Sequence, residues 1–250
     1  MTELVHVATD LGDAATHWPP GQQPCPRGHA TRHVSRPQRS GAAWYSETQL
    51  RGAPPAAVVA STAIGNPFVA ARPRRDQTVV DLGGGAGLDA IIASHLVGPE
   101  GRVYLVDNSA FAVSMARRNA RHARCDNITC VHADMAGAAM PPSSVDWIIA
   151  NHVLSFAADR AATVRRARHL LKPGGKLVCA MLVRTGAHAG PKPCAHTPLP
   201  VRQVESLLSD AGFARTDTVE RRDLGGDLAA VTVVGHTTPR LTTVQPELGR

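Results

Sequence analysis

The chain has 250 residues, of which 43% are hydrophobic and 19% charged, and its formal net charge is +7. This length suits one domain with a full hydrophobic core. No apolar run reaches the ~18 residues of a membrane-spanning helix, and the first residues lack the basic and apolar stretches of a secretory signal. The five cysteines show no Cys-x-x-Cys spacing, so we expect a reduced, cytoplasmic protein.

The positive net charge raises the question of a nucleic-acid partner. Only four Phe and two Tyr are present, which leaves few aromatic rings on which bases could stack. The arginines gather at 72–75, 117–121 and 165–168, and the last two groups fall on expected helices, where a solvated face explains them. We therefore expect neither a nucleic-acid nor a membrane partner, and the sequence leaves a homodimer open.

Residues 1–43 are rich in Pro and Gly and show little periodicity, which predicts a loop-rich N-terminal arm or lid. Pro55 suits the first turn of a helix that continues over 56–63, and Gly65-Asn-Pro67 ends it and starts a short second one. From Val79 onward, short apolar runs alternate with helical patterns. Strands are expected near 78–82, 102–106, 128–132, 145–150, 176–183, 214–221 and 228–236, and helices near 88–96, 109–121, 159–171 and 201–211.

Apolar strands separated by helices predict a parallel sheet that is covered on both faces. Asp223-Leu-Gly-Gly-Asp227 lies between the last two expected strands and predicts a β-hairpin, which adds an antiparallel strand. The expected fold class is therefore α/β, with a seven-stranded, mostly parallel sheet. It spans residues 44–236, and the polar tail at 237–250 is expected to be flexible.

The segment Asp81-Leu-Gly-Gly-Gly-Ala-Gly87 joins the first of these strands to a helix. Glycines in such a turn let the backbone approach a ligand, and the N–H groups of the following helix point at it. A dinucleotide site has Gly-x-Gly-x-x-Gly and faces a pyrophosphate, which a carboxylate at Asp81 would repel. An acid two residues before Gly83 suits a cationic ligand without phosphates, and S-adenosylmethionine has an ammonium and a sulfonium group.

Polar residues mark the ends of the first four expected strands, where an open α/β sheet binds its ligands. They are Asp81, Asp107, Asp134 and Asn151. Asp107 ends the second strand, where an acid is placed to accept hydrogen bonds from ribose hydroxyls. The pattern therefore predicts one nucleoside-binding edge. NAD-binding proteins share the acid at the second strand, so it is Asp81 and the glycine spacing that argue against a nicotinamide-dependent oxidoreductase.

Taken together, these segments resemble the class I S-adenosylmethionine-dependent methyltransferases, which have a Rossmann-like fold. The matching motifs, in chain order, are Asp81–Gly87, Val103–Asp107, Val131-His-Ala-Asp134, Val145-Asp-Trp-Ile-Ile-Ala-Asn151 and Leu170-Leu-Lys-Pro-Gly-Gly-Lys-Leu177. The resemblance implies S-adenosyl-L-methionine as cofactor. It implies that Asp107 binds the ribose and Asp134 the adenine amino group, and that the other cofactor-binding residues are Asp81, Gly83, Gly85, Gly87, Asn108, Met135 and Asn151.

A narrower resemblance is to the arsenite methyltransferase branch. It rests on Tyr45-Ser-Glu-Thr-Gln-Leu50, Gly65-Asn-Pro67, Leu96-Val-Gly-Pro-Glu-Gly101 and Ser144–Asn151. The branch places a metalloid-binding Cys directly after the Asn of the fourth strand, whereas this chain has His152. A second branch Cys lies after the fifth strand in a longer insert, but here Cys194 stands in a different context, and no alignable motif surrounds Cys25.

Two residues are candidates for the transfer step. His152 follows the fourth strand, where it could take a proton from a hydroxyl or amine acceptor, or else pack against the acceptor or hydrogen-bond to it. By resemblance Tyr45 would lie over the sulfonium, although burial beside Trp44 also explains it. His17, His29, His33 and Cys25 lack the spacing of a zinc site, so we expect no metal.

The sequence thus predicts a methyltransferase that acts on a small organic acceptor, with a role in secondary metabolism. One alternative is an arsenite methyltransferase, whose chemistry needs thiolates to hold a soft metalloid. The other is a protein of the same fold that binds S-adenosylmethionine without transferring the methyl group, or that runs a non-methylating reaction.

Overall fold

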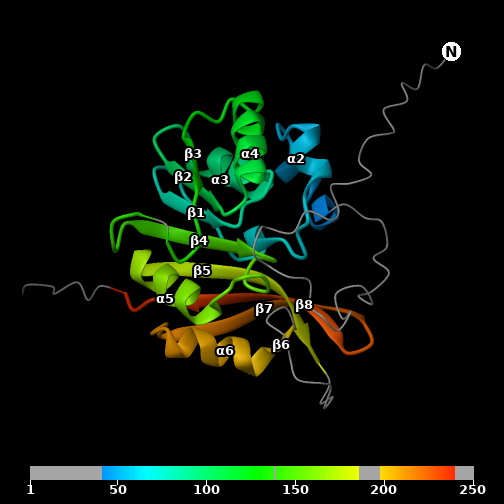
Figure 1. Ribbon diagram of the computed structural model, residues 1–250, viewed down its shortest axis with the longest axis vertical. Coiled ribbons are helices and arrows are strands. Elements are labelled where there is room, and N and C mark those ends of the chain that lie inside the picture. Colours follow the sequence, from blue (N-terminus) through cyan, green and yellow to red (C-terminus); the bar gives the residue numbers. More distant parts are fainter. Residues whose placement is uncertain (1–40, 138, 186–197, 240–250) are drawn as a thin grey trace, which may run out of the picture. The chain divides into compact units, whose positions relative to one another are not determined.

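The computed structural model describes residues 41–137, 139–185 and 198–239 (Figure 1). In these residues eight strands form one sheet in the order β3-β2-β1-β4-β5-β8-β7, and β6 pairs with β5. The strands are β1 Thr78–Leu82, β2 Arg102–Asp107, β3 Ile128–His132, β4 Val145–Asn151, β5 Leu171–Arg184, β6 Leu199–Pro200, β7 Arg215–Gly225 and β8 Leu228–His236.

Strands β1 to β6 pair in parallel, and β8 runs antiparallel to both β5 and β7. Gly225 and Gly226 form the hairpin turn with φ values of 95° and 62°, a region that glycine adopts without strain. The expected α/β fold with a terminal antiparallel strand is confirmed. Strand order reverses at β1, which pairs with β2 on one side and β4 on the other, and this reversal locates the ligand-binding edge of such a sheet.

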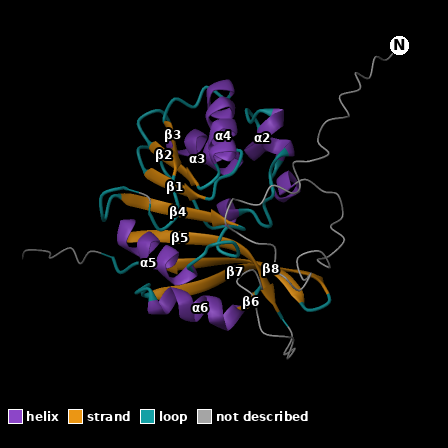
Figure 2. Cartoon of the chain, in the orientation of Figure 1, coloured by secondary structure: helices purple, strands orange, loops and turns teal. Residues whose placement is uncertain are grey.

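Helices cover both faces of the sheet (Figure 2). The α-helices are α1 Glu47–Leu50, α2 Pro55–Val59, α3 Leu88–Val97, α4 Ala110–His122, α5 Arg160–Leu170 and α6 Val201–Asp210, and two short 3-10 helices are η1 Gly41–Trp44 and η2 Pro67–Val69. Ser109 caps α4, since its hydroxyl accepts from the Ala112 N–H, and Gly212 follows α6 with a φ of 88°.

The core divides by strand periodicity, because successive side chains of a strand face opposite sides. Val79 and Ile149 pack with α3, α4 and the 41–71 segment, whereas Val80 and Ile148 pack with α5 and α6. In Figure 1 these helix groups lie on opposite sides of the sheet. The N-terminal part of the domain therefore covers the same face as the glycine turn.

Some boundaries differ from the expected ones. β5 begins at Leu171, because the Pro173-Gly-Gly175 segment bulges out and the register against β4 jumps from Val145–Leu171 to Trp147–Lys176. Helix α1 was not expected. It forms because Ser46 and Gln49 make a capping box, in which the Ser46 hydroxyl accepts from the Gln49 N–H and the Gln49 side chain accepts from the Ser46 N–H.

Helix α2 stops at Val59, earlier than expected, and the chain turns into the stretch at 60–63. Within the described ranges no helix is long and apolar enough to cross a membrane, and no group of three or more His, Cys, Asp or Glu side chains is placed to hold a metal ion. Several sequence-based interpretations fall outside the described residues, namely those on Cys25, Cys194, His17, His29, His33, the arm before residue 41 and the tail after residue 239.

Candidate functional site

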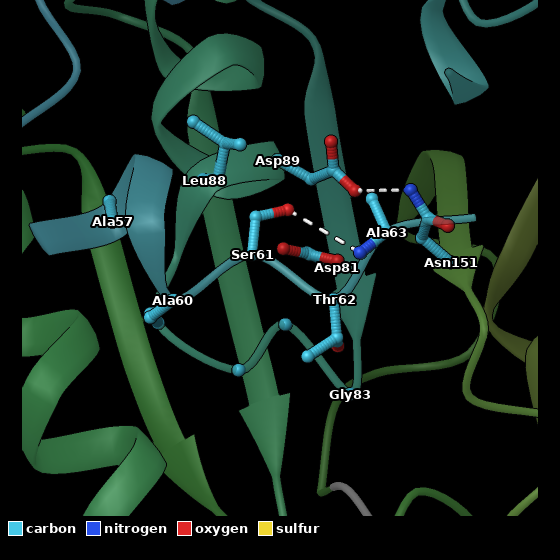
Figure 3. A pocket seen from close by; sticks show the side chains of 13 residues that line it. Ala57, Ala60, Ser61, Thr62, Ala63, Asp81, Gly83, Leu88, Asp89 and Asn151 are labelled. Carbon is cyan, nitrogen blue, oxygen red and sulfur yellow. Dashed lines mark hydrogen bonds between the residues drawn. The ribbon is translucent and has the colours of Figure 1, made fainter. Parts of the chain in front are cut away.

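A small pocket lies at the carboxyl ends of β1 and β4 (Figure 3). Its volume is about 50 Å³, which is room for a small polar group. One wall is the stretch after α2, and the other comprises the glycine turn, the start of α3 and the end of β4. The lining residues are Ala57, Ala60, Ser61, Thr62, Ala63, Asp81, Gly83, Gly84, Gly85, Ala86, Leu88, Asp89 and Asn151.

The glycine turn has a backbone that other residues adopt poorly. Gly83 has a φ of 65°, and a Cβ there would overlap the Val153 side chain. Gly85 has a φ of 53°, and its Cβ position is open space within 4 Å. The turn is held from β2, because the Gly83 N–H donates to the Val106 carbonyl at 2.7 Å and the Gly85 N–H donates to Asp107 Oδ2 at 3.0 Å. It therefore forms a cradle in which a ligand can lie against bare backbone.

Asn119 of α4 holds the same turn from behind. Its side chain is fully buried, and Nδ2 donates to the Ala86 carbonyl at 2.9 Å. Gly87 adjoins this contact with a φ of 91°, and a Cβ there would lie 3.3 Å from the Ala116 Cβ. Close packing of α3 against α4 thus accounts for Gly87, and this residue does not line the pocket.

Asp81 is the most deeply buried acid of the site, with 1% of its surface exposed. Its Oδ2 has no hydrogen-bond partner within the described residues. Burial raises the pKa of its carboxyl well above the ordinary value, and the nearby charges of Asp89 and Asp107 raise it further. A buried carboxyl oxygen without a hydrogen-bond partner lowers stability, so the site suits a ligand that brings a hydrogen-bond donor to Asp81 Oδ2.

Asp89 belongs to the first turn of α3 and faces the same pocket. Its Oδ1 accepts from the Tyr45 hydroxyl at 2.6 Å, and its Oδ2 accepts from Asn151 Nδ2 at 3.1 Å. Figure 3 shows Asp89 joined to Asn151 beside Asp81. Burial raises the pKa of Asp89 to about 6, against the lowering effect of these two hydrogen bonds. Burial, followed by the charge of Asp89, raises the pKa of Tyr45 well above 10.

No lysine or arginine is among the residues that line this pocket in the described part of the chain. Two buried acids without a cation make a site that favours a positively charged ligand. The two acids need a positive charge, and Asp81 Oδ2 needs a hydrogen-bond donor. The ammonium of an amino-acid ligand supplies both. The residues therefore fit the amino-acid end of S-adenosylmethionine.

The tip of β2 presents the next acid. Asp107 is 9% exposed, and its Oδ1 accepts from the Ser109 N–H at 2.9 Å while its Oδ2 accepts from the Gly85 N–H at 3.0 Å. A carboxylate has about four acceptor positions, so it keeps capacity for two ribose hydroxyls. The exposed Asn108 follows, and its carbonyl lies 3.1 Å from His132 Nε2.

Asp134 and Met135 lie just beyond β3. Asp134 is exposed, and its Oδ1 accepts from the Ala136 N–H at 2.8 Å, which stabilises the local turn. Met135 is 6% exposed and packs in the core on the α5 and α6 face. Neither residue lines the small pocket.

His152 follows β4 with a positive φ of 64°, which is uncommon for a residue with a side chain. Its N–H donates to the Ala180 carbonyl at 2.7 Å, and its ring meets the Phe156 ring edge-on at 5.0 Å between centroids. It is not among the residues that line the pocket. Backbone strain of this kind recurs at functional sites, so the turn at His152 merits a direct test.

The fold thus brings four of the sequence-predicted residues into one pocket: Asp81, Gly83, Gly85 and Asn151. Tyr45 joins them through Asp89, and Asp107 joins them through Gly85. Asn108, Asp134, Met135 and His152 lie outside its lining. Sequence reasoning missed Asp89, Asn119 and the wall at 60–63. An acid in the first turn after a glycine loop was the available signal for Asp89, although favourable interaction with the helix dipole explains such an acid equally well.

Comparison with known proteins identifies a family and several relatives of this chain. The family described as "Methyltransferase domain" matches residues 73–213. An arsenite methyltransferase of Halobacterium salinarum is 27% identical over 190 residues, which cover 68% of this chain and 49% of that protein. The chain therefore spans about half the length of this curated relative.

Solved structures share the fold at lower identity. An arsenic(III) S-adenosylmethionine methyltransferase from Chlamydomonas reinhardtii superposes with a TM-score of 0.68 at 21% identity, over 80% of this chain and 74% of that one. The [4+2]-cyclase SpnF superposes with a TM-score of 0.58 at 16% identity, over 69% of this chain and 80% of that one. Proteins with these different reactions are thus built on the same scaffold.

Proposed function

Because this chain belongs to the methyltransferase domain family, among the class I proteins that use S-adenosylmethionine, we propose that it transfers the cofactor's methyl group to a small organic molecule. The observation that carries the proposal is the pair of buried acids, Asp81 and Asp89, beside a bare glycine turn and without a cation in the pocket lining. A phosphate-bearing cofactor would meet repulsion there, whereas an amino acid meets a complementary charge.

Each part of the edge has a role in this proposal. Asp81 and Asp89 hold the ammonium end, while Gly83 and Gly85 give the backbone its close approach. Asp107 binds the ribose hydroxyls. The adenine lies near Asp134, with Asn108 and Met135 on either side of it, and Gly87 keeps α3 packed behind the turn.

Bound S-adenosylmethionine supplies an electrophilic methyl group on a sulfonium. The protein has to align an acceptor with the carbon–sulfur bond that breaks, so that the electron pair of that bond goes to sulfur. We place the acceptor on the side of Asn151 and His152, where His152 takes up the proton that a hydroxyl or amine acceptor loses. The resemblance implies a place near the sulfonium for Tyr45, whose hydroxyl donates to Asp89.

An organic acceptor is favoured over a metalloid by the described cysteines. Burial raises the pKa of the thiols of Cys125, Cys130 and Cys179, that of Cys179 to about 12, which disfavours their thiolate forms. A soft metalloid needs accessible thiolates. We therefore propose an oxygen, nitrogen or carbon nucleophile as acceptor, of the kind found in secondary metabolism, for a protein that works in the cytoplasm.

The first experiment is a binding measurement. Titration calorimetry with S-adenosylhomocysteine should give a saturable signal, and NADH should give none. Binding of NADH in place of S-adenosylhomocysteine would overturn the proposal at its basis.

The second experiment tests His152. With a panel of small acceptors, His152→Ala should lower turnover about 10²-fold and leave the Kd of S-adenosylhomocysteine unchanged, if the imidazole acts as a general base. His152→Asn keeps a hydrogen-bonding group without the titration, so recovery of turnover in that variant would assign His152 to anchoring. A loss of cofactor binding in His152→Ala would place it among the structural residues.

Similarity to an arsenite methyltransferase supports a second candidate function. It predicts arsenite methylation that disappears when Cys25 and Cys194 are both replaced by Ser. Equal rates in the double variant, or no arsenite activity in the natural chain, would exclude metalloid chemistry of the usual kind.

A third reading keeps cofactor binding without methyl transfer, and the shared fold of a [4+2]-cyclase motivates it. In that case S-adenosylhomocysteine binds, but no acceptor in the panel gains a methyl group. Mass spectrometry of the products distinguishes this outcome from the leading proposal.

A further inference from the structure

The strongest unexplained feature is a buried cluster formed by Tyr45, Asp89 and Asn151. Asp89 accepts from both of the others, and Asn151 Nδ2 also lies 3.0 Å from the Tyr45 hydroxyl oxygen. Tyr45 and Asn151 are separated by 106 positions in the chain and Tyr45 and Asp89 by 44. Contacts of this kind form only when the segment before α1 closes onto the sheet.

The same asparagine also fixes the wall of the pocket. Its Oδ1 accepts from the Ile64 N–H at 3.2 Å, and its Nδ2 donates to the Gly65 carbonyl at 3.0 Å. Upstream, the Gly41 N–H donates to the Ser61 carbonyl at 2.9 Å. The Gly41 contact closes the segment 41–66 on itself, and the segment meets Asn151 through Tyr45 near its start and through Ile64 and Gly65 near its end.

This wall stands close to the glycine turn. The space between them is about 50 Å³, whereas pockets for whole ligands of drug size usually hold about 300–1,000 Å³. The enclosed part fits the charged end of an amino acid and no more. The wall at 57–63 therefore lies over the amino-acid end of a bound cofactor, while the ribose and adenine lie outside this pocket, near Asp107 and Asp134.

We propose that Tyr45, Asp89 and Asn151 form a latch, which fastens the segment 41–66 over the cofactor and points Asp89 at its ammonium group. This rests on the function proposed above. Hydrogen bonds to an ionised carboxylate in a buried site are stronger than neutral ones, which suits them to hold a moving segment closed. Each oxygen of Asp89 keeps a further acceptor position, so an ammonium can join the cluster without displacing Tyr45. Bound cofactor and closed segment thus reinforce each other.

The first test removes one hydroxyl. In Tyr45→Phe, S-adenosylhomocysteine should dissociate at least about tenfold faster, and the Ile64 amide should exchange its hydrogen faster. The matched control is Tyr104→Phe on β2, which deletes the hydroxyl of the one other tyrosine of the chain, a residue that packs on the opposite core. This control should match the natural protein in both measurements. Unchanged dissociation and exchange in Tyr45→Phe would overturn the latch, as would an equal loss in both variants.

The second test isolates the charge of Asp89. In Asp89→Asn, the Kd of S-adenosylhomocysteine should rise about tenfold or more, because the ammonium loses its partner. Methylthioadenosine lacks the amino-acid end, so its Kd should stay within about twofold of the natural value. An equal rise for both ligands would show that Asp89 does not meet the ammonium group, and would overturn that part of the proposal.

The third test separates the latch from a role for Tyr45 at the sulfonium. S-adenosylhomocysteine has a neutral sulfur, whereas S-adenosylmethionine is charged there. The latch predicts that Tyr45→Phe weakens both ligands by the same factor. A selective loss of S-adenosylmethionine would instead assign Tyr45 to the sulfonium.

Failure of the proposed function is distinguishable from failure of the latch. If the natural chain binds neither ligand, the function is wrong. The ligand-free hydrogen exchange of Ile64, compared between Tyr45→Phe and Tyr104→Phe, still decides whether these side chains hold the segment closed.

Discussion

Two pairs of acids at the same edge of the sheet differ in how their oxygens are satisfied. Asp107 and Asp134 accept from backbone N–H groups of the turns around them, at 2.8 to 3.0 Å. Asp81 and Asp89 are buried deeper, and Asp89 depends on the distant side chains of Tyr45 and Asn151. One oxygen of Asp81 has no partner within the described residues.

The difference indicates that burial of Asp81 and Asp89 destabilises the ligand-free protein. A carboxylate that accepts local backbone N–H groups stabilises its own turn, and its geometry requires little from the rest of the fold. A buried carboxylate with long-range partners, or with none, is costly until a cation arrives. We therefore expect the Asp81 and Asp89 end to respond strongly to substitution and pH, and the Asp107 and Asp134 end to respond mainly through ligand affinity.

The largest effect is expected from Asn151→Leu. The change leaves Asp89 Oδ2, the Gly65 carbonyl and the Ile64 N–H without their partner. We expect the free energy of unfolding, measured with urea, to fall by about 3–5 kcal/mol. A loss below about 1 kcal/mol would mean that stability is no more sensitive to substitution at the Asp81 and Asp89 end than at the Asp107 and Asp134 end, which would contradict the comparison.

The next effect concerns pH. The folded pKa of Asp89 is raised from 3.8 to about 6, so its protonated form is favoured in the fold. The stability that this provides is fully present below pH 3.8, and it is lost as the pH rises through about 6. The loss amounts to about 3 kcal/mol, and Asp81 acts in the same direction.

Urea unfolding of the ligand-free protein between pH 4 and 8, compared with Asp89→Asn, measures this term. The natural chain should lose stability relative to the variant as the pH rises. If the free energy of unfolding changed with pH equally in the two proteins, ionisation of Asp89 would cost the fold no stability.

A middle effect is expected at Asp107, for which we propose a role in binding the ribose. Asp107→Ala should weaken S-adenosylhomocysteine by about 1–3 kcal/mol, because charge-assisted hydrogen bonds to the ribose are lost. Titration calorimetry measures it. The control is Asp223→Ala in the hairpin, where the side chain is 73% exposed and pairs with Arg221. Equal affinity in the two variants would remove Asp107 from the site.

The smallest effect is expected for Asp134→Ala. This acid is exposed and accepts one backbone hydrogen bond, so thermal or urea unfolding should change by about 1 kcal/mol or less. Affinity for S-adenosylhomocysteine should fall modestly through the adenine amino group. A stability loss as large as that of Asn151→Leu would contradict the contrast between the two ends.

Much of the candidate site could be predicted from the sequence. The run from Asp81 to Gly87 and the acid at Asp107 lie within single strand–turn units, where spacing along the chain fixes geometry. The elements that were misplaced have other causes. β5 begins at Leu171 because this residue already pairs with Val145, and pairing with β4 resumes at Lys176 after the bulge. Helix α1 forms through a capping box, and its four residues are too few to give a periodic pattern.

By itself, the sequence determined the alternation of strands and helices, the glycine turn and the acids that end the strands. Periodicity and backbone constraints act over a few residues, so each of these features can be read from its own neighbourhood. Only the tertiary structure decided that Tyr45 meets Asp89, that Asn119 holds Ala86 and that the stretch at 60–63 walls the pocket. Those contacts join residues tens of positions apart. Their partners are chosen when most of the segment 41–71 is buried on one face of the sheet while Ile64 joins the core of the other face.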